Sequence, residues 1–340
     1  MLASLLLPLL LLADVPLPAE ILLLDAGGAR LAFVDAVTFE PRGEIRLAGQ
    51  PRDMAVSPRG DRVLVSDWGD PATRQPGARV FLADLASRTL LKTIDLARPC
   101  GPLGIAWAPD ESEAWVSCQG RQSVLVLDPA AGTVVAEVPV VDLGGNVLAM
   151  APDGARLWVL CQNAARVVEL DPRERRVVRR MAVGKSPTDL ALAPDARSLW
   201  VTAYGNQEIG ILDLATGRVS ALLRTPVGPV RVLFSPGRGW AYAVGNSTGY
   251  VSAYDPERGL ELERRAVGTG PMTAAFPPDG SVLAVGLTGK APGLTLLDPV
   301  TLERRAGGAL AFAPWGVAFV NLPAAGRVGG GVSPSPQSSK

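Results

Sequence analysis

Histidine is absent from this 340-residue chain, and its absence excludes several classes of chemistry. Without an imidazole the chain cannot form a Ser-His-Asp or Cys-His nucleophile pair, a His-ligated zinc site or the proximal ligand of a haem. Any general acid or base would be a carboxylate, a tyrosine or a perturbed lysine. We therefore expect neither haem nor zinc. The cofactor is otherwise unknown, and Ca²⁺ or Mg²⁺ stays open because Asp and Asn occur at predicted loop ends.

Neither sign of charge dominates, since 33 Lys and Arg stand against 33 Asp and Glu. The arginines are scattered along the predicted outer strands, so no basic stripe exists to meet a phosphate backbone, and nucleic acid is excluded as a partner. A helical hydrophobic period is also missing beyond a few residues. The apolar runs are short and nearly continuous, which is typical of strands covered on both faces.

What the chain does have is a repeat. An aspartate closes a short apolar run at spacings of 42 to 49 residues, and a proline that ends the first strand of each unit keeps a matching period. A self-similar period of this size indicates stacked supersecondary units. We expect the aspartates to cap turns on the face opposite the predicted binding face. They are Asp35, Asp84, Asp128, Asp171, Asp213, Asp255 and Asp298.

Each unit predicts four short strands. In the unit that begins at Thr188, the small apolar run Thr188 to Ala193 predicts an innermost strand, and Ser198 to Ala203 is rich in β-formers. Ile209 to Leu212 follows as the third strand, and a Gly-containing turn leads to the polar outer strand Arg218 to Leu223.

The last unit is divided between the two ends of the chain. The C-terminal run Trp315 to Val320 lacks partners after it, and the N-terminal runs Ile21 to Leu24, Arg30 to Val34 and Glu44 to Ala48 match the three missing strands. The sequence therefore predicts an all-β, seven-bladed β-propeller over residues 20–322. Each blade has four antiparallel strands, and the last is closed by C-terminal strand A plus N-terminal strands B, C and D.

Both ends of the chain fall outside the predicted propeller. Residues 1–19 predict a secretory signal peptide, since Leu5 to Leu12 is an apolar run too short to span a bilayer. An uncleaved anchor and a misassigned start are the alternatives. Residues 323–340 are rich in Gly, Ser and Pro and predict a disordered tail. We expect an extracytoplasmic protein, periplasmic or secreted, with no integral membrane segment beyond the signal-like N-terminus.

Three cysteines are present, without the CxxC spacing of a metal or redox motif. Cys118 and Cys161 occupy equivalent positions in neighbouring units, about 10 Å apart, which is too far for a disulfide. The alternatives are a bridge between Cys100 and Cys118, or three thiols.

The units resemble the YVTN-type β-propeller repeat. The matching stretches are the second-strand run Trp200-Val201-Thr202, the strand end Leu212-Asp213, the outer-strand end Val183-Gly184 and Gly270-Pro271 before the next unit. Leu64-Val65-Ser66-Asp67 departs from the pattern because it lacks the aromatic residue. The resemblance covers about residues 20 to 322 and implies a fold shared by surface-layer and periplasmic proteins of unrelated roles. The haem-binding and lactonase-like propellers of this kind rely on histidines that this chain does not have.

Strand order places the candidate ligand-binding residues around the mouth of the central channel. Connections from fourth to first strands and from second to third strands emerge on that face. The one long insertion, Asp67 to Ala78, lies there too. Loops on a rigid scaffold commonly bind ligands. The candidates are Arg52, Asp53, Asp67, Trp68, Asp189, Tyr204, Arg231 and Trp315.

Two functions fit this sequence. The favoured hypothesis is a non-catalytic binding scaffold for a protein or small-molecule ligand, with no catalytic residues or metal ligands assigned. The alternative is a hydrolase, lyase or oxidoreductase that uses Asp53, Asp189, Tyr204 and Arg231, with or without a divalent metal.

Overall fold

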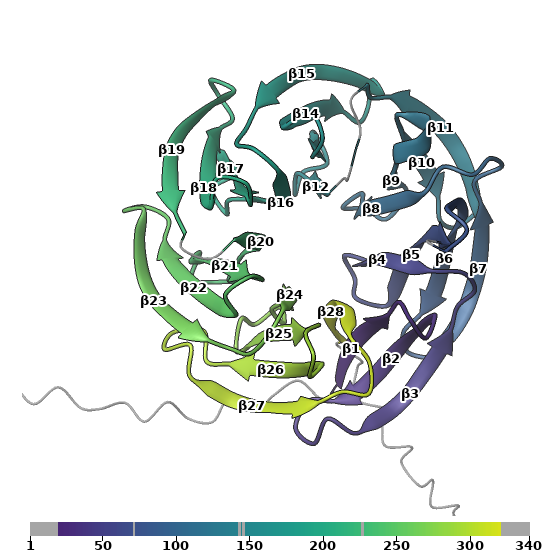
Figure 1. The fold of residues 1–340 in the computed structure, drawn as a ribbon. Helices are drawn as coiled ribbons and strands as arrows, with labels where there is room; N and C mark the ends of the chain where they lie inside the picture. Colours follow the sequence, from purple (N-terminus) through teal and green to yellow (C-terminus); the bar gives the residue numbers. More distant parts are fainter. Residues whose placement is uncertain (1–19, 71, 142–143, 145–146, 226–227, 321–340) are drawn as a thin grey trace, which may run out of the picture.

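The computed structural model forms a ring of seven four-stranded antiparallel sheets, a seven-bladed β-propeller (Figure 1). It describes residues 20–320 except 71, 142–143, 145–146 and 226–227. The predicted signal segment and tail lie outside these residues and stay predictions. Among the described residues there is no helix of the length and apolarity that crossing a membrane requires.

The innermost strands surround the ring axis, and the fourth strands form its rim (Figure 1). The innermost strands are β4 (Pro51–Val56), β8 (Pro102–Trp107), β12 (Leu148–Met150), β16 (Pro187–Leu192), β20 (Pro229–Phe234), β24 (Pro271–Ala275) and β28 (Pro314–Val320). The second strands are β1 (Glu20–Asp25), β5 (Arg62–Asp70), β9 (Ala114–Cys118), β13 (Leu157–Cys161), β17 (Ser198–Ala203), β21 (Ala241–Gly245) and β25 (Leu283–Leu287).

The third strands are β2 (Arg30–Asp35), β6 (Gln75–Asp84), β10 (Ser123–Asp128), β14 (Arg166–Asp171), β18 (Glu208–Asp213), β22 (Tyr250–Asp255) and β26 (Gly293–Leu297). The outer strands are β3 (Pro41–Arg46), β7 (Thr89–Asp95), β11 (Thr133–Pro139), β15 (Arg176–Ala182), β19 (Arg218–Arg224), β23 (Leu260–Ala266) and β27 (Arg304–Ala309). A short 3-10 helix, η1 (Gln119–Arg121), joins β9 to β10.

The ring closes as the sequence predicts. β28 pairs antiparallel with β1 in the sheet β28-β1-β2-β3, with Ile21 opposite Phe319 and Leu22 opposite Ala318. Pairing the tail of the chain with its head covers the edge of β1 that would otherwise be open, and β28 takes the innermost position of the sheet. The outer strand β3 begins earlier than predicted, at Pro41, because a register shift opposite Phe33 and Val34 lets pairing start directly after the turn.

Burial explains the nearly continuous apolar runs. All five residues of β9 and of β13 are buried, because neighbouring blades cover both faces of each sheet. Outer strands such as β11 instead alternate exposed and partly buried residues. Aromatic contacts join blades across their faces: Trp200 packs edge-on against Phe234 at 5.5 Å and against Tyr254 at 6.4 Å, ring centre to ring centre.

The seven repeated aspartates cap turns, as predicted. Each accepts at least one backbone N–H from the residues that follow it; Asp213, for example, accepts Thr216 N at 2.7 Å. The others accept equivalent bonds at Asp35, Asp84, Asp128, Asp171, Asp255 and Asp298.

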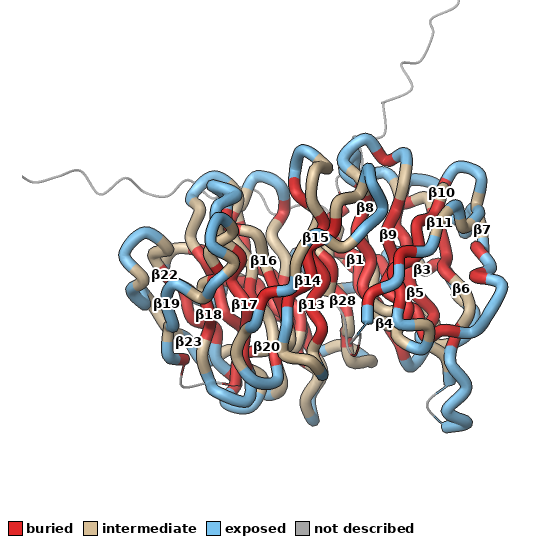
Figure 2. The backbone as a smooth tube through the Cα atoms, turned by 90° about the horizontal axis from the view of Figure 1, so that it is seen from above, coloured by how far each residue is buried: buried red, intermediate tan, exposed pale blue. Residues whose placement is uncertain are grey.

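The two faces of the ring differ in what they carry. We call the face that bears the β5–β6 hairpin and η1 the mouth face. Seen from the side, the hairpin protrudes from the lower face in Figure 2, and the described chain ends lie toward the opposite face. Glu20 and Val320 pair there directly. Glu20 and Val320 therefore lie away from the mouth face.

Candidate functional site

The innermost strands β4, β8, β16, β20 and β24 share a bulge that fixes the side chain at their third position. In β4 and β16 the pairing with the second strand shifts register after the leading proline. The backbone N–H of the third residue then donates to a hydroxyl on the second strand. Asp53 N donates to Ser66 Oγ at 3.1 Å, and Asp189 N donates to Thr202 Oγ1 at 2.8 Å. The bulge thus places Asp53 and Asp189 at equivalent points of the ring.

Both carboxylates also join their innermost strand to the next one. Asp53 Oδ2 accepts Ile105 N at 3.3 Å, and Asp189 Oδ2 accepts Val232 N at 2.8 Å. These bonds cross from blade to blade, so each aspartate stabilises the ring whatever else it does.

Asp53, Asp189 and Arg231 form an axial charge cluster. Arg231 Nη1 lies 3.5 Å from Asp189 Oδ1, between neighbouring innermost strands. Arg231 also lowers the pKa of Asp53, although β4 and β20 belong to blades that are not adjacent in the ring. The electrostatic interaction between Arg231 and Asp53 therefore reaches across the axis, and the structure brings together three of the predicted residues.

Burial dominates the electrostatics of this cluster. Desolvation raises the pKa of Asp189 from its ordinary value of 3.8 to about 6, against the opposing effect of Arg231. Desolvation likewise raises the pKa of Asp53, while the Asp189 carboxylate raises the pKa of Arg231. The two carboxylates hold protons more tightly than ordinary aspartates do.

Arg52, Trp68 and Trp315 form a second group at the mouth, here called the mouth cluster. The Arg52 guanidinium carbon lies 4.0 Å from the ring centre of Trp315 and 5.8 Å from that of Trp68. Burial lowers the pKa of Arg52. The three side chains come from β4, β5 and β28, so this contact joins the split blade to the next. Trp68 stays 36% exposed.

The insertion from Asp67 to Ala78 extends the β5–β6 hairpin. Gly69 pairs with Pro76 and Asp70 with Gln75 beyond the usual end of these strands. Asp67 itself is buried at the base: its carboxylate accepts Gln50 N at 2.9 Å and pairs with Arg79 Nη2 at 2.8 Å. Its side chain therefore holds the hairpin to the β3–β4 connection.

Tyr204 lies apart from both clusters. It sits on the β17–β18 turn, where its backbone N–H donates to Ser186 O at 3.1 Å, and it is 42% exposed. Within the described residues, no contact joins its hydroxyl to the axial charge cluster.

A groove of about 750 Å³ opens beside Trp68 on the mouth face. Its walls come from the hairpin, from the segment around the disulfide and from Asn163 of the next blade. The sequence indicated the insertion, but it gave no reason to place Gln122 and Gly101 beside it. The lining residues used below are Trp68, Asp70, Arg74, Gln119, Gln122 and Asn163.

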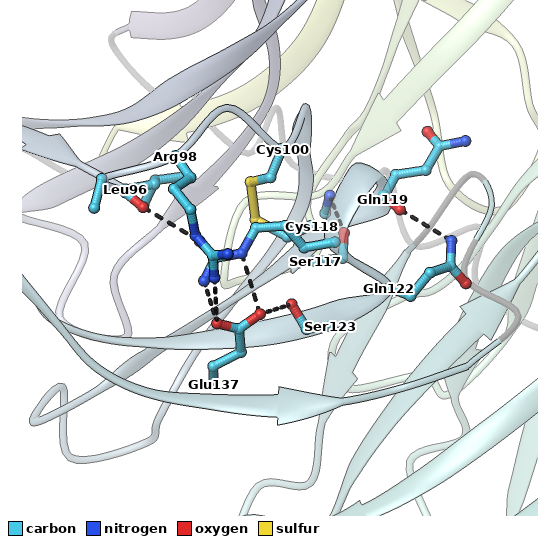
Figure 3. Close-up of a disulfide and its surroundings, with 12 residues drawn as sticks. Leu96, Arg98, Cys100, Ser117, Cys118, Gln119, Gln122, Ser123 and Glu137 are labelled. Atoms are coloured by element: carbon cyan, nitrogen blue, oxygen red, sulfur yellow. Dashed lines mark hydrogen bonds and ion pairs between the residues drawn. A yellow bond between two sulfur atoms is a disulfide. The ribbon is translucent and has the colours of Figure 1, made fainter.

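A disulfide joins Cys100 to Cys118 at the back of this groove (Figure 3), with their Cα atoms 5.2 Å apart. The bridge is one of the two alternatives that the sequence left open. Cys161 is a buried thiol. Close to the disulfide, Arg121 and Ser123 both donate to Glu137, and Arg121 Nη1 donates to Leu96 O at 3.2 Å.

Metal ligands do not gather in the part of the chain that the structure describes. No three Asp, Glu or Cys side chains there lie close enough to hold an ion. A separate hollow of about 530 Å³ lies between turns on the opposite face, lined by residues such as Arg238, Asp279 and Arg305.

Known structures share the fold. The chain is similar to Kuenenia stuttgartiensis hydrazine synthase, with 19% identity, a TM-score of 0.69, and coverage of 86% of this chain and 97% of that one. It is also similar to a functionally unknown protein from Desulfotomaculum acetoxidans DSM 771, with 14% identity, a TM-score of 0.71, and coverage of 88% and 98%.

A third similar structure is the dihydro-heme d1 dehydrogenase NirN in complex with DHE. It has 16% identity and a TM-score of 0.64, with 89% of this chain and 75% of that one covered. No family model and no curated protein matches the chain. At these identities the likeness shows the seven-bladed propeller alone, and the YVTN-type resemblance stays a prediction.

Proposed function

We propose that this chain is a non-catalytic, extracytoplasmic binding scaffold of the YVTN-type propeller kind, which presents its mouth face to a protein or small-molecule ligand. The mouth cluster is the observation that carries the proposal. Trp and Arg are the residues that most often dominate binding energy in interfaces. Here Arg52 holds Trp68 and Trp315 together on a rigid sheet scaffold, and Trp68 remains accessible.

The protruding hairpin supports the same proposal. It enlarges the mouth face on one side only, and its base is fixed by the ion pair between Asp67 and Arg79. A fixed protrusion beside an exposed aromatic residue gives a partner a shaped surface at little cost in conformational entropy.

Capture from native envelope extract tests this function. The protein is immobilised through its C-terminus, because Val320 lies on the opposite face. We expect Arg52→Ala and Trp68→Ala each to reduce retention of the bound partner at least about tenfold. Arg238→Ala is the matched control. The Arg238 guanidinium carbon lies 5.7 Å from the ring centre of Trp240, and this pair is separate from the mouth cluster. Equal partner profiles for all variants would refute the proposal.

A catalytic function has one observation in its favour. Asp189, with its pKa raised to about 6, lies within electrostatic reach of Asp53 and Arg231, and perturbed carboxylates are common at acid–base sites. The binding function is preferred because both carboxylates already accept interblade hydrogen bonds and Tyr204 lies elsewhere. Thermal shifts with Ca²⁺ and Mg²⁺, compared between wild type and Asp189→Asn, would detect a metal-dependent site there.

A further inference from the structure

The groove beside Trp68 has a floor held by backbone contacts from two blades. Gly77 O accepts Cys100 N at 2.9 Å and Gly101 N at 3.0 Å, and Cys100 O accepts Gly120 N at 2.8 Å. The disulfide from Cys100 to Cys118 ties the same segment to β9. The hairpin, the disulfide segment and η1 are therefore one connected unit, organised before any ligand arrives.

The walls of the groove carry side-chain amides beside apolar groups such as those of Trp68 and Pro76. Gln75, Gln119, Gln122 and Asn163 bring side-chain amides from three blades, and Figure 3 shows Gln119 and Gln122 on one side of the disulfide. An amide both donates and accepts hydrogen bonds. Such a lining offers hydrogen bonds to hydroxyl groups and an apolar surface to the rest of the ligand.

Charge in the groove is balanced. Asp70 and Arg74 are its charged lining residues. Asp70 Oδ1 accepts Ala72 N at 2.8 Å, and this bond lowers the pKa of Asp70, so the carboxylate stays ionised while it caps the hairpin turn. One negative and one positive charge leave the groove neutral overall, which favours an uncharged ligand.

Trp68 is the aromatic residue of the groove lining. Its indole lines the groove at 36% exposure, and Gly101 beside it has a φ of +59°, a conformation that side chains rarely adopt. An accessible aromatic ring beside convergent hydrogen-bonding groups recognises a ring with one apolar face and polar edges.

We propose that this groove binds a neutral saccharide, with a sugar ring stacked on Trp68 and its hydroxyls bonded to the amides of Gln119 and Asn163. The inference rests on the proposed binding function of the mouth face and specifies the ligand class for one part of it.

Isothermal titration with defined probes tests the proposal. The probes are cellotetraose, chitotetraose and maltotetraose as neutral saccharides, with tetragalacturonate as the acidic one, each up to about 10 mM. We expect at least one neutral probe to bind wild type with a Kd below about 1 mM. Trp68→Ala should weaken that binding at least about tenfold, and Trp68→Phe should retain most of it because a ring remains.

Tyr250→Ala is the matched control, because Tyr250 is 36% exposed, like Trp68, but belongs to a distant blade. Its binding should equal that of wild type. Circular dichroism melts check that every variant is folded. No binding of any probe, or equal loss in Trp68→Ala and Tyr250→Ala, would overturn the saccharide proposal. Binding of tetragalacturonate alone, removed by Arg74→Gln, would overturn the neutral class.

The two proposals fail in different ways. If the saccharides do not bind but envelope partners are still captured through Arg52 and Trp68, only the saccharide inference is wrong. If capture is also insensitive to these residues, the binding function of the mouth face is wrong as well.

Discussion

Arg231 and Asp189 face each other between two neighbouring innermost strands, with Nη1 and Oδ1 3.5 Å apart. A guanidinium this close would normally lower the pKa of an aspartate. Burial outweighs it here, so the pKa of Asp189 is raised from 3.8 to about 6. The pair thus links ring stability to pH.

Asp189→Asn should reveal that link. Because the pKa of Asp189 is higher in the folded state, its contribution to stability is fully present below pH 3.8 and is lost as pH rises through about 6. The free energy of unfolding of the variant, relative to wild type, should therefore increase by about 2 kcal/mol between pH 4 and pH 7. Urea denaturation at both pH values measures it, and a difference that does not change with pH would contradict the assignment.

Removing β28 should open the ring. Truncation after Gly308 exposes Ile21 and Leu22, which pair with that strand in the full chain. We expect a lower melting temperature and a broader, less cooperative transition by calorimetry, since the sheet β28-β1-β2-β3 loses its innermost strand. A melting curve identical to that of the full chain would argue against closure by head and tail.

Cys100→Ser with Cys118→Ser should lower stability. The bridge closes a loop with a sequence separation of 18, for which loop entropy predicts a loss of about 3 kcal/mol. Denaturant midpoints measure the change, with Cys161→Ala as a single-thiol control. Alkylation of the denatured, unreduced wild type should modify Cys161 only, and three modified cysteines would contradict the bridge.

Trp200→Ala should destabilise the contact between two blades. The indole is 1% exposed and packs against Phe234 and Tyr254. Loss of a buried aromatic side chain costs about 3 to 5 kcal/mol. Trp200→Phe should recover part of that loss in the same chemical denaturation experiment, and equal stability of Trp200→Ala and wild type would show that the blades do not depend on this contact.

The sequence predicted the architecture because the repeat depends on local interactions. The aspartate caps, the strand-ending prolines and the fully apolar second strands each depend on residues close in the chain, so their period defines blades directly. Counting the strands of each unit also predicted that the C-terminal strand pairs with the three N-terminal strands and closes the ring. The start of β3 differed because a bulge, which depends on cross-strand register, decides where pairing begins.

The candidate site was harder to predict because its contacts join residues far apart in the chain. Strand order placed Arg52, Trp68 and Trp315 on one face, but only the folded ring shows Arg52 against both indoles. Asp67 was grouped with them by position alone, and its side chain instead pairs with Arg79. The interaction of Asp53 with Arg231 spans the ring axis, which no local pattern encodes.

A structure of the protein purified from its own host tests the binding function most directly. The account predicts bound density over the mouth face, in contact with Trp68 or Trp315. Density in the opposite hollow beside Arg238 and Arg305, with the mouth face bare, would contradict it.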